Sequence, residues 1–265
     1  MAIDYIIEYK CYPKQELTPE GILDRVKGRA RAEAVIDLFR RNGDQRPADQ
    51  MGFEFVRNSA DGEQETRVVY VQEMLDQAAQ LAPYEMYCEG CPANNTGVPF
   101  GCMGQIEYPI SRAAESWLLS LLPVTDETLP WLLLKQGVQE FKVDGQAVNS
   151  MREPGQPFFE EPSVLGRRLG ELMANSNMVF QMLFLLGHIR PSYAGPLLLF
   201  FKAIRRDLEA DQIMTLSQSP EDAFERYPFL HQPEPSDDAS ITQFKRFFRA
   251  LYLAWGLNVR LVLDV

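Results

Sequence analysis

The chain has 265 residues, a formal net charge of −11 and a hydrophobic fraction of 46%. This length and composition predict a globular protein with one large or two ordinary domains and a substantial buried core. The acidic charge argues against broad, non-specific binding to nucleic acid, because neutralising phosphates needs clustered lysine and arginine.

The sequence begins MAIDYIIEYK, with no basic stretch followed by an apolar run, so we expect no export signal. A cytoplasmic, reducing compartment follows from that expectation, and disulfides are disfavoured there. The longest apolar stretches, residues 178–187 and 195–204, are about half the ~20 residues that a membrane-spanning helix needs. They predict buried core helices, and no membrane span is expected.

The first 110 residues alternate between strand and helix patterns. Thr18-Pro19 is typical of a helix start and Asn42-Gly43 of a helix end, while Asp61-Gly62 predicts a hairpin turn. The order matches a ferredoxin-like βαββαβ sandwich, in which both helices cover one face of a four-stranded antiparallel sheet. In chain order, the patterns predict a strand at 3–11, a helix at 18–42, strands at 51–57 and 66–72, a helix at 73–82 and a strand at 104–110.

From residue 111 onward the patterns predict a mainly helical part that packs on the sandwich. A capping box over residues 240–243 opens the last predicted helix, and its apolar stripe faces the core. A small hairpin is expected around residues 143–145, and residues 257–263 predict a final strand that returns to the N-terminal sheet. We therefore expect an α+β protein with a sandwich over residues 1–110 and a helical part over 111–265. The predicted helices cover 111–121, 127–135, 165–174, 177–187, 193–210, 220–226 and 241–255, with surface loops at 152–163 and 227–239.

The four cysteines form the pattern with the greatest chemical specificity. Cys88 and Cys91 are separated by two residues, so their thiolates can hold one ion from a tight turn, which Gly90 permits. Cys102 follows in a nearby loop, and the ferredoxin-like topology places the start of its strand beside the end of the strand carrying Cys11. The sequence therefore predicts an all-thiolate metal site formed by Cys11, Cys88, Cys91 and Cys102.

Zinc is the expected metal because it favours closed tetrahedral thiolate sites, and an iron–sulfur cluster is the alternative. A closed four-thiolate zinc site is structural, since catalysis needs an open coordination position. A three-cysteine site with bound water would instead permit catalysis. Unligated or reversibly oxidised thiols and structural disulfides are the remaining interpretations.

Basic residues gather in the predicted helix over residues 25–41. Arg25 and Arg29 share one helical face and Lys27 and Arg31 share another, which offers a weak anion-binding surface. Acidic residues are interleaved among them, so ion pairs along the helix surface are the expected role.

Other candidates for catalysis are weaker. His188 is expected to cap the carbonyls of an apolar helix, and His231 to be solvated in its loop. The adjacent Glu160 and Glu161 are not expected to form an acid–base pair, because neighbouring side chains point in different directions. No catalytic residue is predicted, and the sequence leaves open whether the protein is an enzyme.

These observations favour a zinc-structured, non-enzymatic, cytoplasmic regulatory or adaptor protein whose partner is another protein. One alternative is a redox protein that uses an iron–sulfur cluster or the Cys88–Cys91 thiol pair. A second alternative is an RNA- or nucleotide-binding effector that uses the basic helix over residues 25–41.

Overall fold

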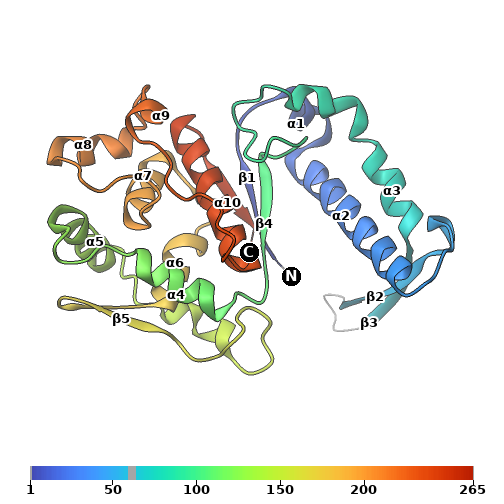
Figure 1. Cartoon of the computed structure of the whole chain (residues 1–265), viewed down its shortest axis with the longest axis horizontal. Coiled ribbons are helices and arrows are strands. Elements are labelled where there is room, and N and C mark those ends of the chain that lie inside the picture. Colours follow the sequence, from blue (N-terminus) through green and yellow to red (C-terminus); the bar gives the residue numbers. More distant parts are fainter. Residues whose placement is uncertain (1, 59–63, 265) are drawn as a thin grey trace. The chain divides into compact units, whose positions relative to one another are not determined.

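The computed structural model of the chain describes residues 2–58 and 64–264, which form two compact units (Figure 1). Unit 1 combines the residues up to Tyr9, Pro92–Thr96 and the residues from Gly101 onward. Unit 2 combines Lys10–Cys91 and Gly97–Phe100. Both units contain helices and antiparallel strands, which confirms the predicted α+β class.

Unit 1 is built on a four-stranded antiparallel sheet with the order β4-β1-β8-β7. Most of the helices belong to this unit, together with a separate two-stranded hairpin, β5–β6. Its elements, in which η marks a 3₁₀ helix, are β1 (Ala2–Ile7), β4 (Met103–Glu107), α4 (Arg112–Leu121), α5 (Thr128–Glu140), η3 (Gln146–Arg152), β5 (Gly166–Leu169), β6 (Leu172–Asn175), α6 (Ser176–Phe184), β7 (His188–Ile189), α7 (Pro191–Phe200), α8 (Ala210–Thr215), η4 (Leu216–Gln218), α9 (Ala223–Arg226), α10 (Ala239–Gly256) and β8 (Leu261–Asp264).

Helix α10 covers the sheet by packing on β1 and β4. Its apolar stripe is buried as predicted, and the ring of Phe247 meets that of Tyr5 edge to face at 5.5 Å between centroids. Tyr5 pairs with Gly104 across the β1–β4 ladder. A Cβ atom on Gly104 would lie 2.3 Å from the Tyr5 hydroxyl oxygen, so only glycine leaves room for this ring.

The predicted return of the last strand to the N-terminal sheet is confirmed. Strand β8 pairs with β1, with Leu263 opposite Tyr5, and it buries Leu261 and Leu263. It lies between β1 and β7 and therefore occupies one of the two edges of β1. The ferredoxin-like topology is not confirmed, because β2 and β3 form a separate two-stranded sheet and β8 takes the place beside β1.

In unit 2, two helices pack together beside the hairpin β2–β3 (Figure 1). The pairing of these two strands was predicted. Thr18 caps the long helix as expected, since its hydroxyl accepts the Gly21 amide at 3.1 Å. The predicted turn at Asp61-Gly62 lies outside the described residues. Buried Ala32, Met51 and Val71 form the centre of a small core. The elements are α1 (Tyr12–Leu17), α2 (Pro19–Arg41), η1 (Ala48–Gln50), β2 (Gly52–Asn58), β3 (Gln64–Tyr70), α3 (Val71–Ala79) and η2 (Ala82–Cys88).

The helix predicted over residues 165–174 is wrong, because this segment forms the β5–β6 hairpin. Leu169 pairs with Leu172 on either side of a two-residue turn. Gly170 in that turn has φ of +62°, a conformation that ends a helix and suits a hairpin.

The helix predicted over residues 193–210 ends early, at Phe200. Arg206 folds back so that its Nε donates to the Leu199 carbonyl at 2.8 Å and its Nη2 to the Phe200 carbonyl. Because the guanidinium satisfies the last carbonyls of α7, the chain can leave the helix there without unpaired acceptors.

Two predicted local motifs also differ from the structure. Asp238 caps α10 by accepting the Ile241 amide at 2.7 Å, whereas the Ser240 hydroxyl, assigned to the capping box, accepts the Ser111 amide. The hairpin expected around residues 143–145 is absent from the described residues, because Gly145, at φ of +79°, leads directly into η3.

Candidate functional site

Three of the four cysteines belong to unit 2, where two separate segments bring them together. Cys11 directly precedes α1, and Cys88 is the last residue of η2, which contacts α1. Cys91 follows in a turn, in which the backbone amide of Cys91 donates to the Cys88 carbonyl at 3.3 Å. Gly90 has φ of +68° in this turn, as the cysteine spacing predicted. All four cysteines carry thiols.

The pKa of Cys88 is affected by its burial and by the other two thiols of unit 2. Burial raises this pKa above its usual value, and negative charge on Cys91 and Cys11 raises it further. The Phe100 amide opposes the shift by donating to the Cys88 Sγ atom at 3.2 Å. The Cys88 thiol is therefore harder to ionise than an ordinary cysteine thiol.

Cys102, the fourth predicted ligand, belongs to unit 1 and is buried. Its strand begins beside the end of the first strand, as predicted, because the Ile7 amide donates to the Cys102 carbonyl at 3.0 Å. That first strand ends at Ile7, however, and does not carry Cys11 as expected. Among residues 2–58 and 64–264, no group of three or more His, Cys, Asp or Glu side chains is arranged to hold a metal ion.

The basic residues of α2 meet partners from the segment that follows α3. The Arg25 guanidinium donates twice to the Gln80 side chain, at 2.8 and 3.2 Å. Arg29 pairs with Glu85 of η2 at 3.1 Å. These contacts link α2 to another element, whereas the sequence pattern predicted ion pairs along the helix itself.

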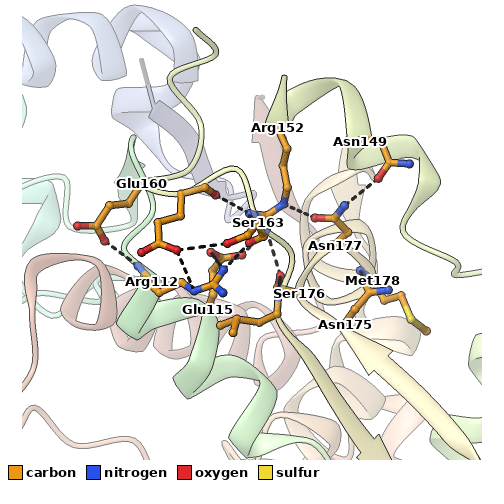
Figure 2. Close-up of polar contacts among 12 residues, drawn as sticks. Arg112, Glu115, Asn149, Arg152, Glu160, Ser163, Asn175, Ser176, Asn177 and Met178 are labelled. Carbon is orange, nitrogen blue, oxygen red and sulfur yellow. Dashed lines mark hydrogen bonds and ion pairs between the residues drawn. The ribbon is translucent and has the colours of Figure 1, made fainter. Parts of the chain in front are cut away.

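A buried polar network in unit 1 was not predicted from the sequence (Figure 2). The guanidinium of Arg152, at the end of η3, bonds the carboxylate of Glu115 from α4, and both side chains are almost fully buried. Arg112 lies 3.8 Å from the second Glu115 oxygen. Figure 2 shows how these side chains converge from η3, α4 and the start of α6. The network therefore joins three elements of unit 1.

Each nitrogen of the Arg152 guanidinium has an acceptor within the protein. Besides Glu115, the acceptors are the Asn177 side chain, the Ser176 hydroxyl at 3.1 Å and the Glu161 carbonyl at 3.0 Å. The Cζ atom of the guanidinium also lies 3.7 Å from the centroid of the Phe159 ring. Because its donors are all used within the protein, the role of Arg152 here is structural: it holds these segments of unit 1 together.

Most residues of the predicted surface loop over 152–163 are exposed as expected, but the network buries Arg152 and Phe159 within it. The Glu160 carboxylate accepts a hydrogen bond from the Arg112 backbone amide at 2.8 Å. The Glu161 carboxylate forms an ion pair with the Arg112 guanidinium at 3.5 Å. A signal was present in the sequence, because Glu115 shares the buried face of α4 with Leu118 and Leu119. A carboxylate on an apolar helix face indicates a buried partner.

An apolar hollow of about 220 Å³ lies between α5, α6 and α7. Leu134, Met182 and Phe200 are among the side chains that line it. At its rim, Phe141 is 66% exposed and its ring lies 6.2 Å from that of Tyr193. An exposed phenylalanine beside an apolar hollow is typical of a surface that contacts another molecule.

Both histidines differ from their predicted roles. His188 is in β7 and caps no helix. Its Nε2 accepts a hydrogen bond from the Arg190 Nε at 3.3 Å. His231 is partly buried against the Trp117 and Phe248 rings, and its Nε2 lies 2.8 Å from the Phe201 carbonyl. Burial lowers the pKa of His231 to about 4, so its imidazole is neutral near pH 7.

Comparison with known proteins finds no matching family model, no similar curated protein and no similar solved structure. In the part of the chain that the structure describes, no helix is both long and apolar enough to cross a bilayer.

Proposed function

We propose that this chain is a cytoplasmic regulatory or adaptor protein that acts through protein contacts without catalysing a reaction, and that zinc stabilises its unit 2. The observation that carries the proposal is the grouping of Cys11, Cys88 and Cys91 in unit 2, where negative charge on Cys91 and Cys11 disfavours ionisation of Cys88 by raising its pKa. A divalent cation removes that repulsion, and binding it makes folding of the unit more favourable.

Zinc bound there would join the start of α1 to the end of η2 and to the turn at Gly90. The thiol side chains would have to turn toward a common point, because no group of described side chains is arranged as a metal site. Cys102 is proposed as the fourth ligand on the sequence pattern alone. With four thiolates the zinc would be closed to substrate and purely structural.

The redox alternative receives less support. Reactive cysteines have lowered thiol pKa values, often at a helix N-terminus. The pKa of Cys88 is instead raised, chiefly by burial, and Cys88 ends its 3₁₀ helix. An RNA- or nucleotide-binding role also receives less support, since Arg25 and Arg29 already bond Gln80 and Glu85.

The helical part of unit 1 supplies a candidate contact surface. The hollow between α5, α6 and α7 is apolar, and Phe141 stands exposed at its rim. Leu129 and Leu132 on α5 are 41% and 48% exposed. The exposed phenylalanine beside the apolar hollow favours the binding of a protein partner there.

The test is elemental analysis, with an absorption spectrum, on protein purified without added metal and without air. About one zinc per chain and no visible colour is the expected result. Iron with a brown visible band would support the redox alternative instead. Protein without any metal would refute the zinc proposal.

A further inference from the structure

Three tyrosine rings form an exposed patch on unit 2. Tyr12 of α1 lies 5.1 Å from Tyr87 and 6.0 Å from Tyr84 of η2, measured between ring centroids, and the rings are tilted at 51° and 39°. Tyr12 and Tyr87 are each 47% exposed. The Tyr12 and Tyr87 rings therefore offer a large part of their aromatic surface to a ligand.

A carboxylate accompanies this tyrosine patch, which consists of Tyr12, Tyr84 and Tyr87. Glu16 is four residues after Tyr12 in α1, so both side chains lie on the same face of that helix. Glu16 is exposed, and its charge is the main cause that raises the pKa of Tyr12. The patch therefore combines aromatic faces with a negative charge next to them.

Aromatic faces and carboxylates both attract cations, the first through the ring quadrupole and the second through charge. We propose that the tyrosine patch and Glu16 bind the cationic side chain of a lysine or arginine in a partner protein. The net charge of −11 favours the approach of such a basic partner and repels an acidic one.

This inference rests on the proposed role in protein contacts, and its test measures zinc separately. It adds a chemical class of partner, a protein segment that carries exposed lysine or arginine. An anionic ligand would meet repulsion from Glu16, and a purely apolar one would leave that charge without a counterion.

The test uses the full chain with ring-labelled tyrosine and follows the ring signals by NMR. The probe is a blocked Gly-Arg-Gly-Lys-Gly peptide, compared with the same peptide carrying glutamine in place of arginine and lysine. We expect the basic peptide to shift the signals of Tyr12, Tyr84 and Tyr87, and the glutamine peptide to leave them unchanged. Equal shifts with both peptides, or no shift at all, would overturn the proposal.

Variants localise the effect. Tyr12→Ala should weaken binding about three- to fivefold, as expected for one exposed cation–π contact, while Tyr12→Phe, which keeps the ring, should bind normally. Glu16→Gln should weaken binding by a similar factor. Glu33→Gln is the matched control, because Glu33 is exposed in α2 and its loss changes the net charge equally. If Glu33→Gln weakens binding as much as Glu16→Gln, overall charge explains the effect and the site does not exist.

Two further measurements separate the possible failures. Tetramethylammonium that bound more tightly than the peptide would assign the patch to a small cation and refute the protein partner. Zinc content is measured on the same samples, so that a chain with zinc but without peptide binding refutes this inference alone. A chain that binds the peptide but holds no zinc refutes the metal proposal alone.

Discussion

Arg152 and Glu115 form an ion pair in which the side chains are only 4% and 2% exposed. The pair connects the end of η3 to α4, and Asn177 and Ser176 extend it to α6 (Figure 2). A charge this deeply buried is stable only with its partner, because burial in a poorly polarisable interior strongly disfavours a lone ion.

Replacing Arg152 by methionine should destabilise unit 1 by up to about 3–5 kcal/mol, since the buried Glu115 would lose its nearest counterion and keep only Arg112, 3.8 Å from its second oxygen. Urea unfolding followed by tryptophan fluorescence measures the change. The control is Arg226→Met, which breaks a pair with Asp222 whose side chains are 42% and 45% exposed. That change should cost about 0–1 kcal/mol. An equal loss of stability in the two variants would show that the buried pair of Arg152 and Glu115 contributes no more than an exposed one.

Replacing Gly104 by alanine should destabilise the sheet of unit 1 by about 1–3 kcal/mol, because the added Cβ would collide with the buried Tyr5 ring. Gly137 in α5 provides the matched control, since a Cβ there meets no atom within 4 Å. Gly137→Ala should stabilise its helix by up to about 1 kcal/mol. Thermal unfolding of both variants checks the opposite signs, and a harmless Gly104→Ala would contradict the packing described here.

Stability should fall as the pH drops from about 6.5 toward 4, in part because of His231. Burial lowers its folded pKa to about 4, so between these values the unfolded chain binds a proton that the folded chain does not. His231→Gln removes this contribution. The stability difference between wild type and variant should therefore shrink by about 2–3 kcal/mol between pH 7 and pH 4. Parallel stability curves for the two proteins would show that His231 is not the cause.

Replacing Cys88 by serine should lower both zinc content and thermal stability if the proposed site exists, because metal-binding energy is part of the folding energy. The same substitution should have little effect once a chelator has removed the metal from both proteins. Cys102→Ser tests the fourth ligand separately, since zinc retained in that variant would leave the site with three cysteines. An equal loss of stability for Cys88→Ser with and without chelator would contradict a metal role.

The sequence predicted elements whose signals are local and strongly periodic. The Thr18 cap of α2, the stripe of α10 that carries Phe248 and Trp255, and the turn at Gly90 are all found as expected. The pairing of β1 with β8 was also predicted, because the alternating segment at 257–263 needed a sheet to join.

Contacts between distant residues account for what the sequence did not predict. Both edges of β1 can accept a strand, and nothing local indicates that β8 pairs there while β2 and β3 pair only with each other. Arg152 lies in a segment rich in proline and acid that reads as a surface loop, and its partner Glu115 is 37 residues away. Arg206 ends α7 from six residues beyond the helix, a distance that capping patterns do not cover.

The central position of β8 affects how the protein folds as it leaves the ribosome. Strand β1 is synthesised first, but its neighbour β8 follows more than two hundred residues later. Unit 2 consists almost entirely of the continuous segment Lys10–Cys91, so all but four of its residues emerge early. Pairings with so high a contact order form slowly. The sheet of unit 1 therefore cannot close until β8 has been made, and one edge of β1 is without its strand partner until then.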